Sequence, residues 1–194
     1  YPGEGSIIHL KPNAAGDSTQ WTPDSGSNFA RVQEVTPDDS TSYVGDKTNT
    51  NSDLYTVEAS GIASNSAINL VQVGARFNNA TADAVTAFKL QIEKTSGGTK
   101  SQSAAIIPNS IIWKTNGTVL LNYPLTLYQD PDSSNWTQAT IDSMQIGVIT
   151  SATGTNNIQV STIWALVEYI PGSGSTLDVA YIGGNPSGLS LIQL

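Results

Sequence analysis

Few side chains in this sequence are suited to acid–base or nucleophilic chemistry. His9 is the only histidine, and it lies between Ile8 and Leu10 in a segment that alternates like a strand. A Ser-His-Asp triad would need this ring as its base. A glycosidase pair would need two carboxylates that converge, and no spacing of the glutamates indicates such a pair. These glutamates are Glu4, Glu34, Glu58, Glu93 and Glu168. The sequence therefore predicts no catalytic residue and no enzymatic function.

Calcium binding by acidic turns is a second kind of chemistry to consider. The segment that begins with Asp130 and Asp132 places oxygen donors at the first, third and fifth positions of an EF-hand-like loop. Its sixth residue is Asn135 rather than glycine, and its twelfth is Ile141 rather than glutamate. Asp130 and Asp132 are therefore only a weak calcium candidate, and we expect no metal and no cofactor. The chain has no cysteine, which excludes a disulfide or a thiolate metal site.

Attached sugar is a third possibility, because the chain contains three sequons. Asn79, Asn116 and Asn135 are the possible glycosylation sites. Their number is what chance predicts for a chain this rich in Asn, Ser and Thr, so they carry little information.

Aromatic side chains are candidates for binding free sugar, since an outward-facing indole stacks well on a pyranose ring. Trp21 and Trp113 flank predicted loops and are the candidates for glycan stacking. Trp136 and Trp164 lie in a predicted helix and a predicted central strand, and we expect both in the core.

Charge and composition narrow the classes of partner. The 194 residues carry 8 Lys and Arg against 16 Asp and Glu, a net charge of -8, and the basic residues are scattered singly. Nucleic acid and anionic membrane surfaces both require clustered cations, so neither is an expected partner. No apolar run is long enough for a membrane-spanning helix. The abundance of Ser, Thr, Asn and Gly is typical of surface and extracellular β proteins, and we expect an extracellular location.

Period-two alternation of apolar residues runs through most of the chain, as in residues 88–92, 119–127 and 144–148. Residues 158–169 become apolar on both sides, which predicts a central strand covered on both faces. The alternation slips near Leu70 and Val71, which predicts a β-bulge. Turn-rich segments separate these strands. The pattern predicts an all-β, antiparallel two-sheet sandwich of jelly-roll-like form.

One segment departs from this alternation. Trp136, Ala139 and Ile141 have helical spacing, and Asn135 or Thr137 can cap the first turn. We expect one short helix near residues 136–143, with Trp136 filling one end of the core.

Several motifs carry a resemblance to a known class of domain. They are the run from His9 to Asp17, Asp53-Leu-Tyr, the run from Asn135 to Val148, and the strand that closes at Val167-Glu-Tyr. Over about residues 7 to 170 the chain resembles a β-sandwich structural domain seen in phage-like and metagenomic virion or extracellular proteins. The resemblance implies a virion-associated or extracellular structural role, with an extracellular or virion-surface location, and carries over no catalytic residue.

The C-terminal residues lie outside that pattern and suggest how the protein acts. We expect residues 1–170 to form the sandwich domain, and residues 171–194 to form a Pro-Gly-Ser-Gly-Ser linker and a strand extension. The extension contains two apolar, strand-like pieces, 177–182 and 189–194, and these need a surface to cover them. They pair either with an open sheet edge of another copy or with their own sheet. The N-terminal residues 1–10 form a second arm with the same two possibilities.

These observations predict a non-enzymatic structural subunit that assembles into an extracellular filament or virion-associated polymer by inter-subunit strand addition. Its expected partner is itself. The alternative is a carbohydrate-binding β-sandwich module, whose partners would be surface glycans. The expected assembly interface comprises Ile7, Ile8, Leu10, Leu177, Val179, Tyr181, Leu189, Leu191, Ile192 and Leu194.

Overall fold

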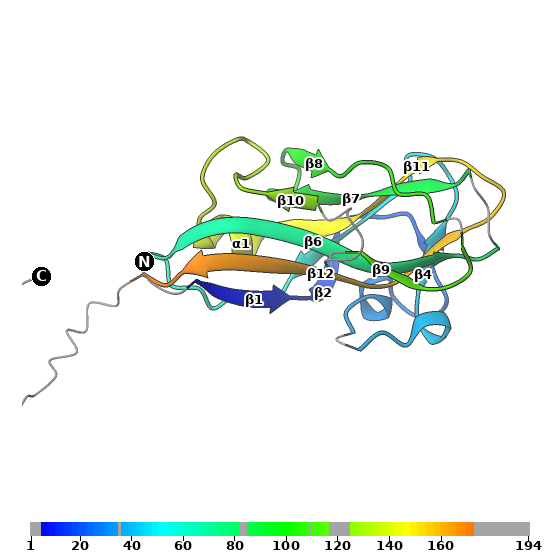
Figure 1. Cartoon of the computed structure of the whole chain (residues 1–194), viewed down its shortest axis with the longest axis horizontal. Helices are drawn as coiled ribbons and strands as arrows, with labels where there is room; N and C mark the ends of the chain where they lie inside the picture. Colours follow the sequence, from blue (N-terminus) through cyan, green and yellow to red (C-terminus); the bar gives the residue numbers. More distant parts are fainter. Residues whose placement is uncertain (1–4, 35, 82–84, 109, 117–124, 173–194) are drawn as a thin grey trace, which may run out of the picture.

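Two antiparallel β-sheets packed face to face form the protein, which confirms the predicted all-β sandwich (Figure 1). The computed structural model describes residues 5–34, 36–81, 85–108, 110–116 and 125–172. Sheet A contains β1 (Ser6–Leu10), β3 (Thr22–Pro23), β4 (Val44–Asp46), β6 (Ala67–Asn79), β9 (Lys114–Asn116), β10 (Leu125–Leu127) and β12 (Ile158–Ile170). Sheet B contains β2 (Pro12–Thr19), β5 (Ser52–Val57), β7 (Ala87–Glu93), β8 (Lys100–Gln102) and β11 (Gln145–Ala152). Helical segments are η1 (Phe29–Arg31), η2 (Asp39–Thr41) and α1 (Gln138–Ser143).

The strand β12 is the centre of sheet A, as its apolar sequence predicts. One edge of β12 pairs with β6 along its whole length, from Ile158 opposite Asn79 to Ile170 opposite Ala67. The other edge is covered in three sections, by β1, by the carbonyl of Val32, which accepts from the N–H of Ile163 at 3.0 Å, and by β4. Figure 1 shows β6 and β12 side by side with β1 beyond them.

The outer face of β12 is not fully covered, so the expectation that both faces are buried is wrong. Ile163, Ala165 and Val167 point into the core and are fully buried. Trp164 and Leu166 point the other way and are only half-buried, because sheet B covers one face of sheet A alone. The ring of Trp164 is instead stacked on that of His9, with their centroids 6.2 Å apart.

The predicted bulge lies in β6. Leu70 pairs with Glu168 and Ile68 pairs with Tyr169, so Asn69 is an extra residue opposite a single step of β12. Ile68 packs against the core, and after the bulge the buried positions are Val71, Val73, Ala75 and Phe77. The extra residue therefore reconciles the two phases of apolar residues in this strand.

The predicted helix is present and begins two residues later than expected, at Gln138. Thr137 is its N-cap and forms a capping box with Thr140. Trp136 comes just before the cap, is 4% exposed, and donates its indole N–H to the carbonyl of Leu127 at 3.2 Å. Its role in filling the core is thus confirmed. None of the helices among the described residues is long and apolar enough to cross a membrane.

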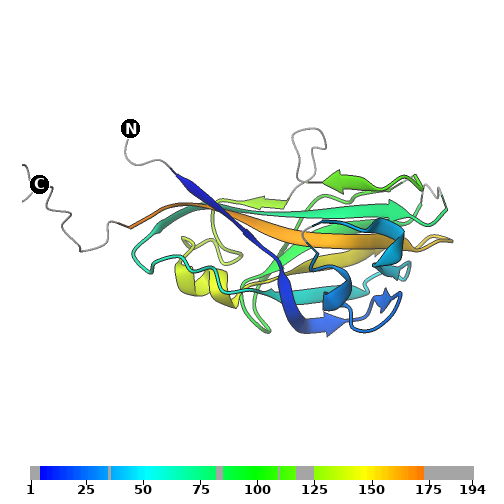
Figure 2. The same ribbon diagram turned by 90° about the horizontal axis from the view of Figure 1, so that it is seen from below.

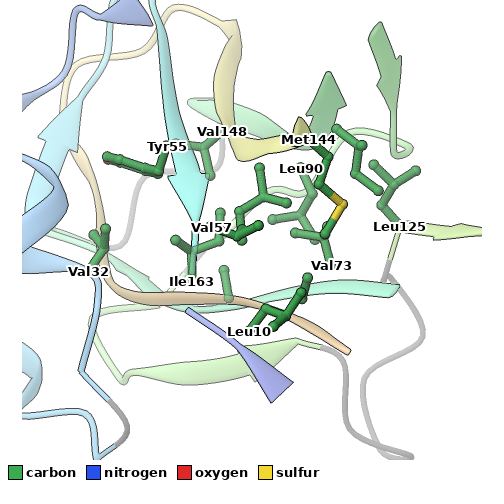
Figure 3. Packing of buried hydrophobic residues seen from close by; sticks show 14 of the residues in the cluster. Leu10, Val32, Tyr55, Val57, Val73, Leu90, Leu125, Met144, Val148 and Ile163 are labelled. Carbon is green, nitrogen blue, oxygen red and sulfur yellow. The ribbon is translucent and has the colours of Figure 1, made fainter. Parts of the chain in front are cut away.

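Side chains from both sheets form one continuous core between Leu10 and Val167 (Figure 3). Leu10 and Ile163 of sheet A lie on one side of it, and Val57 and Leu90 of sheet B lie on the other. The chain changes sheets between its first two strands. The strand β1 belongs to sheet A, and β2, which begins two residues after β1 ends, belongs to sheet B. Figure 2 shows β1 crossing β12 obliquely before the chain continues into β2.

A buried carboxylate fixes the loop that follows β2. Asp53 is 0% exposed, and its Oδ1 accepts from the backbone N–H of Trp21 at 2.9 Å. Its Oδ2 accepts from the side-chain amide of Asn28 at 2.6 Å and from the hydroxyl of Tyr55 at 2.7 Å. Burial raises the pKa of Asp53, and these hydrogen bonds oppose that rise. The carboxylate thereby joins the segment around Trp21 to β5.

Removal of this carboxylate tests its role. Asp53→Ala leaves three donors without an acceptor, and each buried unpaired donor costs about 1–3 kcal/mol. We expect the free energy of unfolding, measured in urea, to fall by about 3 kcal/mol or more. The exposed Asp24 of the same loop is the control, since Asp24→Ala removes a surface ion pair with Arg31 and should cost about 1 kcal/mol or less. Equal losses in the two variants would contradict the assignment.

The pH dependence of stability gives a second measurement on Asp53. Because its pKa is raised, the folded protein holds this proton more tightly than the unfolded chain does. The resulting stability is complete below the unfolded pKa of about 3.9 and is lost as pH rises through the folded pKa. Asp53→Asn has no such group, so its unfolding free energy should improve relative to the wild type as pH rises through that window.

Candidate assembly edge

An open strand edge is the main unpaired feature of the sandwich, and β1 provides it. This strand pairs with β12 in one unbroken register, from Ser6 opposite Tyr169 to Leu10 opposite Ala165. Within the described ranges no strand pairs with its other edge. Half of the backbone N–H and C=O groups of β1 therefore point away from the sheet, where a further strand can bind them.

The other edge strands carry features that hinder pairing. The strand β2 contains Pro12 and two breaks in its register with β5, and β3 has only two residues, one of them Pro23. The strand β8 has three residues and begins with Lys100, and β9 and β10 have three residues each. Short length, proline, lysine and bulges are the devices that protect sheet edges. The strand β1 has five residues and none of these devices.

The side chains of β1 separate into two faces. Leu10 is 2% exposed and belongs to the core, and Ile8 packs against the core. Ile7 is 67% exposed, and His9 is exposed over Trp164. Partial burial of the imidazole lowers the pKa of His9, with smaller effects from Glu58, which raises it, and Lys11, which lowers it. The ring that covers Trp164 is therefore neutral at neutral pH.

The predicted assembly residues of the N-terminal arm need correction. Ile8 and Leu10 serve the core of their own domain, because β1 is already paired with β12. Only Ile7 presents an apolar side chain to solvent from this strand. Of the two possibilities left open for the N-terminal arm, its described strand Ser6–Leu10 follows the second and pairs with its own sheet.

The chain leaves the sandwich next to this edge. Ile170 is the last residue of β12, and the N–H of Gly172 donates to the hydroxyl of Ser66 at 3.1 Å. Because Ser6 lies opposite Tyr169, the start of β1 and the exit of the chain share one end of the molecule (Figure 2). The remaining predicted assembly residues lie outside the described residues, namely Leu177, Val179, Tyr181, Leu189, Leu191, Ile192 and Leu194.

The two tryptophans predicted to stack on glycans have different environments. Trp21 is 2% exposed, and its ring contacts Phe88 edge-on with the centroids 6.4 Å apart. Its indole N–H donates to the carbonyl of Asn51 at 3.1 Å, so the prediction that it faces outward is wrong. The physical reason is the anchoring by Asp53 described above. Trp113 is half-buried in the segment before β9.

The candidate calcium loop already holds a cation from the protein itself. The ammonium of Lys94 lies 2.8 Å from Oδ2 of Asp130 and 2.8 Å from Oδ2 of Asp132. Oδ1 of Asp130 accepts from the backbone N–H groups of Asp132 and Ser134. Burial opposes ionisation of Asp130, but the hydrogen bonds, led by that from Lys94, lower its pKa. Among the described residues no group of three or more His, Cys, Asp or Glu side chains is placed to hold a metal ion.

The possible glycosylation sites are also separated by burial. Asn79 is 0% exposed and is the last residue of β6, so its side chain has no room for a glycan and this prediction is wrong. Asn135 is exposed just before Trp136. The side chain of Asn116 lies outside the described part of the structure.

Two acidic residues on the outer face of sheet B, Asp17 and Glu93, have pKa values that are shifted in opposite directions, as in many acid–base pairs. Hydrogen bonds from Gln145, Gly97 and Ser96 lower the pKa of Asp17, whereas burial raises that of Glu93. The three donors to Asp17 join β2, β11 and the turn between β7 and β8. This arrangement is that of a structural clamp, in which the carboxylate of Asp17 is already hydrogen-bonded.

The stacked pair of His9 and Trp164 is the surface feature that sequence reasoning missed. The alternation did contain a signal, because Leu10 must face the core if β1 pairs in the sheet, and His9 then faces outward.

Comparison of the sequence with models of known protein families finds no match, and no curated protein matches the chain.

Shortening a side chain to alanine should have different effects on the two faces of β1. Leu10→Ala removes a buried side chain and should lower the free energy of unfolding by about 2–5 kcal/mol. Ile7→Ala changes a side chain that is 67% exposed, so the expected loss is within about 0.5 kcal/mol. Urea denaturation followed by tryptophan fluorescence measures both. A large loss for Ile7→Ala in an unassembled sample would mean that β1 is docked differently.

Proposed function

We propose that this chain is a non-enzymatic structural subunit that assembles with copies of itself by strand addition into an extracellular or virion-associated polymer. The observation that carries the proposal is that the chain contains apolar, strand-like residues beyond the described core of the sandwich. Among the described residues the core extends from Leu10 to Val167, and the sequence of residues 173–194 contains two further apolar, strand-like pieces. Those pieces need a surface, and β1 of another copy offers an edge without protection.

Backbone pairing supplies the affinity in this scheme. A strand that binds along β1 extends sheet A by hydrogen bonds to the outward-pointing N–H and C=O groups, each worth about 0.5–1.5 kcal/mol net. Side chains that alternate along the added strand lie beside Ile7 on one face and near the buried margin of the core on the other. The apolar positions Leu177, Val179 and Tyr181 have this alternation.

The linker limits where the receiving edge lies. The residues 171–176 span at most about 20 Å when extended, whereas the 13 residues of β12 span about 43 Å. The added strand therefore cannot run the length of a neighbouring sandwich before it pairs. The receiving edge must lie close to the end at which two copies meet, and β1 begins at such an end.

Two strand-like pieces in each chain favour continued assembly over a closed pair. Each copy offers one open β1 edge, and a pair of copies that exchange one piece each satisfies both edges. The second piece, residues 189–194, then remains for a further contact. A heterologous contact of that kind continues into a polymer unless its rotation closes a ring.

Removal of residues 173–194 tests the proposal directly. The truncated chain should keep its cooperative unfolding transition, since it retains all the core residues that the structure describes, and should be monomeric by light scattering with no polymer visible in electron microscopy. A full-length variant with Leu177, Val179 and Tyr181 changed to serine is the matched control for chain length, and it should behave in the same way. An unchanged polymer yield in both variants would overturn the proposal.

Disulfide trapping tests the receiving edge. The chain has no cysteine, so every disulfide in a mixture of Ile7→Cys and Val179→Cys is intermolecular, and a disulfide that joins the two kinds of chain reports the pairing of the extension with β1. We expect a covalent heterodimer after mild oxidation, with Leu177→Cys and Tyr181→Cys covering the other registers. Gln102→Cys, on the edge strand β8, replaces Ile7→Cys in the control and should give none.

The same cysteines distinguish exchange from folding back. If the extension pairs with β1 of its own chain, the double variant forms an intramolecular disulfide in dilute monomer and the mixed sample forms no heterodimer. That result would contradict strand addition between subunits.

A further inference from the structure

A hollow on the outer face of sheet B has the properties of a small ligand site, and it is separate from the assembly edge on sheet A. Its volume is about 200 Å³, and it lies between the turn before β5, the end of β11 and the strands β7 and β8. Ligand sites for drug-sized molecules measure about 300–1,000 Å³. A ligand of this hollow is therefore no larger than a single ring.

Two irregularities of the backbone meet at this hollow. Thr50 has a φ of 72°, a left-handed conformation that is a true outlier for a β-branched residue. It is held there by two backbone bonds of 2.9 Å, from Thr50 N–H to the carbonyl of Thr150 and from Thr150 N–H to the carbonyl of Asn51. The register between β11 and β7 also shifts after Thr150, which makes Ser151 a bulge residue. Strained residues and bulges both concentrate at binding sites.

Polar groups at the hollow are left incompletely bound. The Oγ of Ser151 is buried and has no hydrogen-bond partner among the described residues. The ammonium of Lys89 makes a long contact of 3.4 Å with Oε1 of Gln102. Within the described part of the chain Lys89 forms no ion pair, unlike Lys94 and Lys100. A weakly bound cation is a group that a polar ligand would satisfy, and the buried Ser151 hydroxyl joins it when that side chain rotates toward the hollow.

The remaining lining residues indicate the chemical class. Asn49 and Gln102 contribute amides that donate and accept, and Ile149 contributes an aliphatic surface. A ligand that uses all of these groups carries a carboxylate for Lys89, hydroxyls for the amides and for Ser151, and a C–H face for Ile149. We propose that the hollow binds one uronic acid residue, either free or within an acidic polysaccharide. A simple inorganic anion would use Lys89 but not the aliphatic surface.

Titration of the full-length protein with glucuronate, followed by NMR shifts and calorimetry, tests the site. The expected dissociation constant is about 1 mM, as befits a few contacts on an open surface. Glucose, which lacks the carboxylate, should bind at least about 10-fold more weakly, and so should inorganic phosphate. The shifts should be confined to residues around the hollow.

Variants make the test specific to this hollow. Lys89→Met keeps the aliphatic stem and should weaken glucuronate binding at least about 10-fold, and Ser151→Ala should weaken it by a smaller factor. Lys47→Met is the matched control, because Lys47 is an exposed lysine that contacts the carbonyl of Thr155. It should leave binding unchanged, and all three variants should keep the wild-type melting temperature.

The titrations of these variants either support the proposed uronic acid site or overturn it. Loss of binding in Lys89→Met with retention in Lys47→Met supports the proposal. Absence of any shift up to about 50 mM glucuronate, equal binding of phosphate or glucose, or unchanged binding in Lys89→Met would each overturn it. None of these results depends on assembly, so truncation of residues 173–194 should leave the affinity for glucuronate as it is.

Discussion

The long strand β12 has two edges, and both must be hydrogen-bonded for the sandwich to exist. One edge is satisfied by β6 over its whole length. The other is satisfied in sections by β1, by the carbonyl of Val32 and by β4, all from the first quarter of the chain. Because buried backbone groups are costly to leave unpaired, the N-terminal segments must fold onto the last strand. This requirement also leaves β1 at the margin of the sheet, with one edge satisfied and one open.

Carboxylates hold several loops of this sandwich in place, as disulfides do in other loop-rich sandwiches. This chain has no cysteine, and its aspartates accept hydrogen bonds from backbone N–H groups in several loops. Asp53 binds Trp21, Asp130 binds Asp132 and Ser134, and Asp17 binds Gly97. Such charge-assisted bonds are stronger than neutral ones. The excess of acidic residues thus has a structural use within the loops, besides its effect on solubility.

Local sequence pattern predicted the parts of the structure that depend on neighbouring residues. The alternation predicted the sandwich and the strands at residues 88–92 and 144–148, its slip near Leu70 indicated the bulge found at Asn69, and the spacing around Trp136 indicated the short helix. Of the strand predicted at 119–127, residues 119–124 lie outside the described residues, and residues 125–127 form β10. The pattern could not tell that sheet B covers only one face of β12, so Trp164 was misplaced. It also could not show that Asp53, 32 residues away, draws Trp21 into the core. Those positions depend on contacts between distant segments.

The hollow on sheet B and the open edge of β1 could not be predicted from the sequence either, because both depend on the arrangement of segments in space. Threonine ordinarily avoids the left-handed conformation that Thr50 adopts, so no local rule would place a turn of that kind there. The openness of β1 depends on which strands lie beside it, and a single sequence does not reveal neighbours in space.

The exit of the chain from β12 determines how the sandwich responds to tension. Gly172 lies two residues after the end of a strand that is paired with β6 from Ile158 to Ile170. A pull applied at Gly172 acts along β12, in the direction that loads those hydrogen bonds in shear, so many of them must break together instead of unzipping singly. The same strand carries β1 on its opposite edge, so a load that arrives through β1 would also pass into the pairing of β6 with β12, the two longest strands that the structure describes.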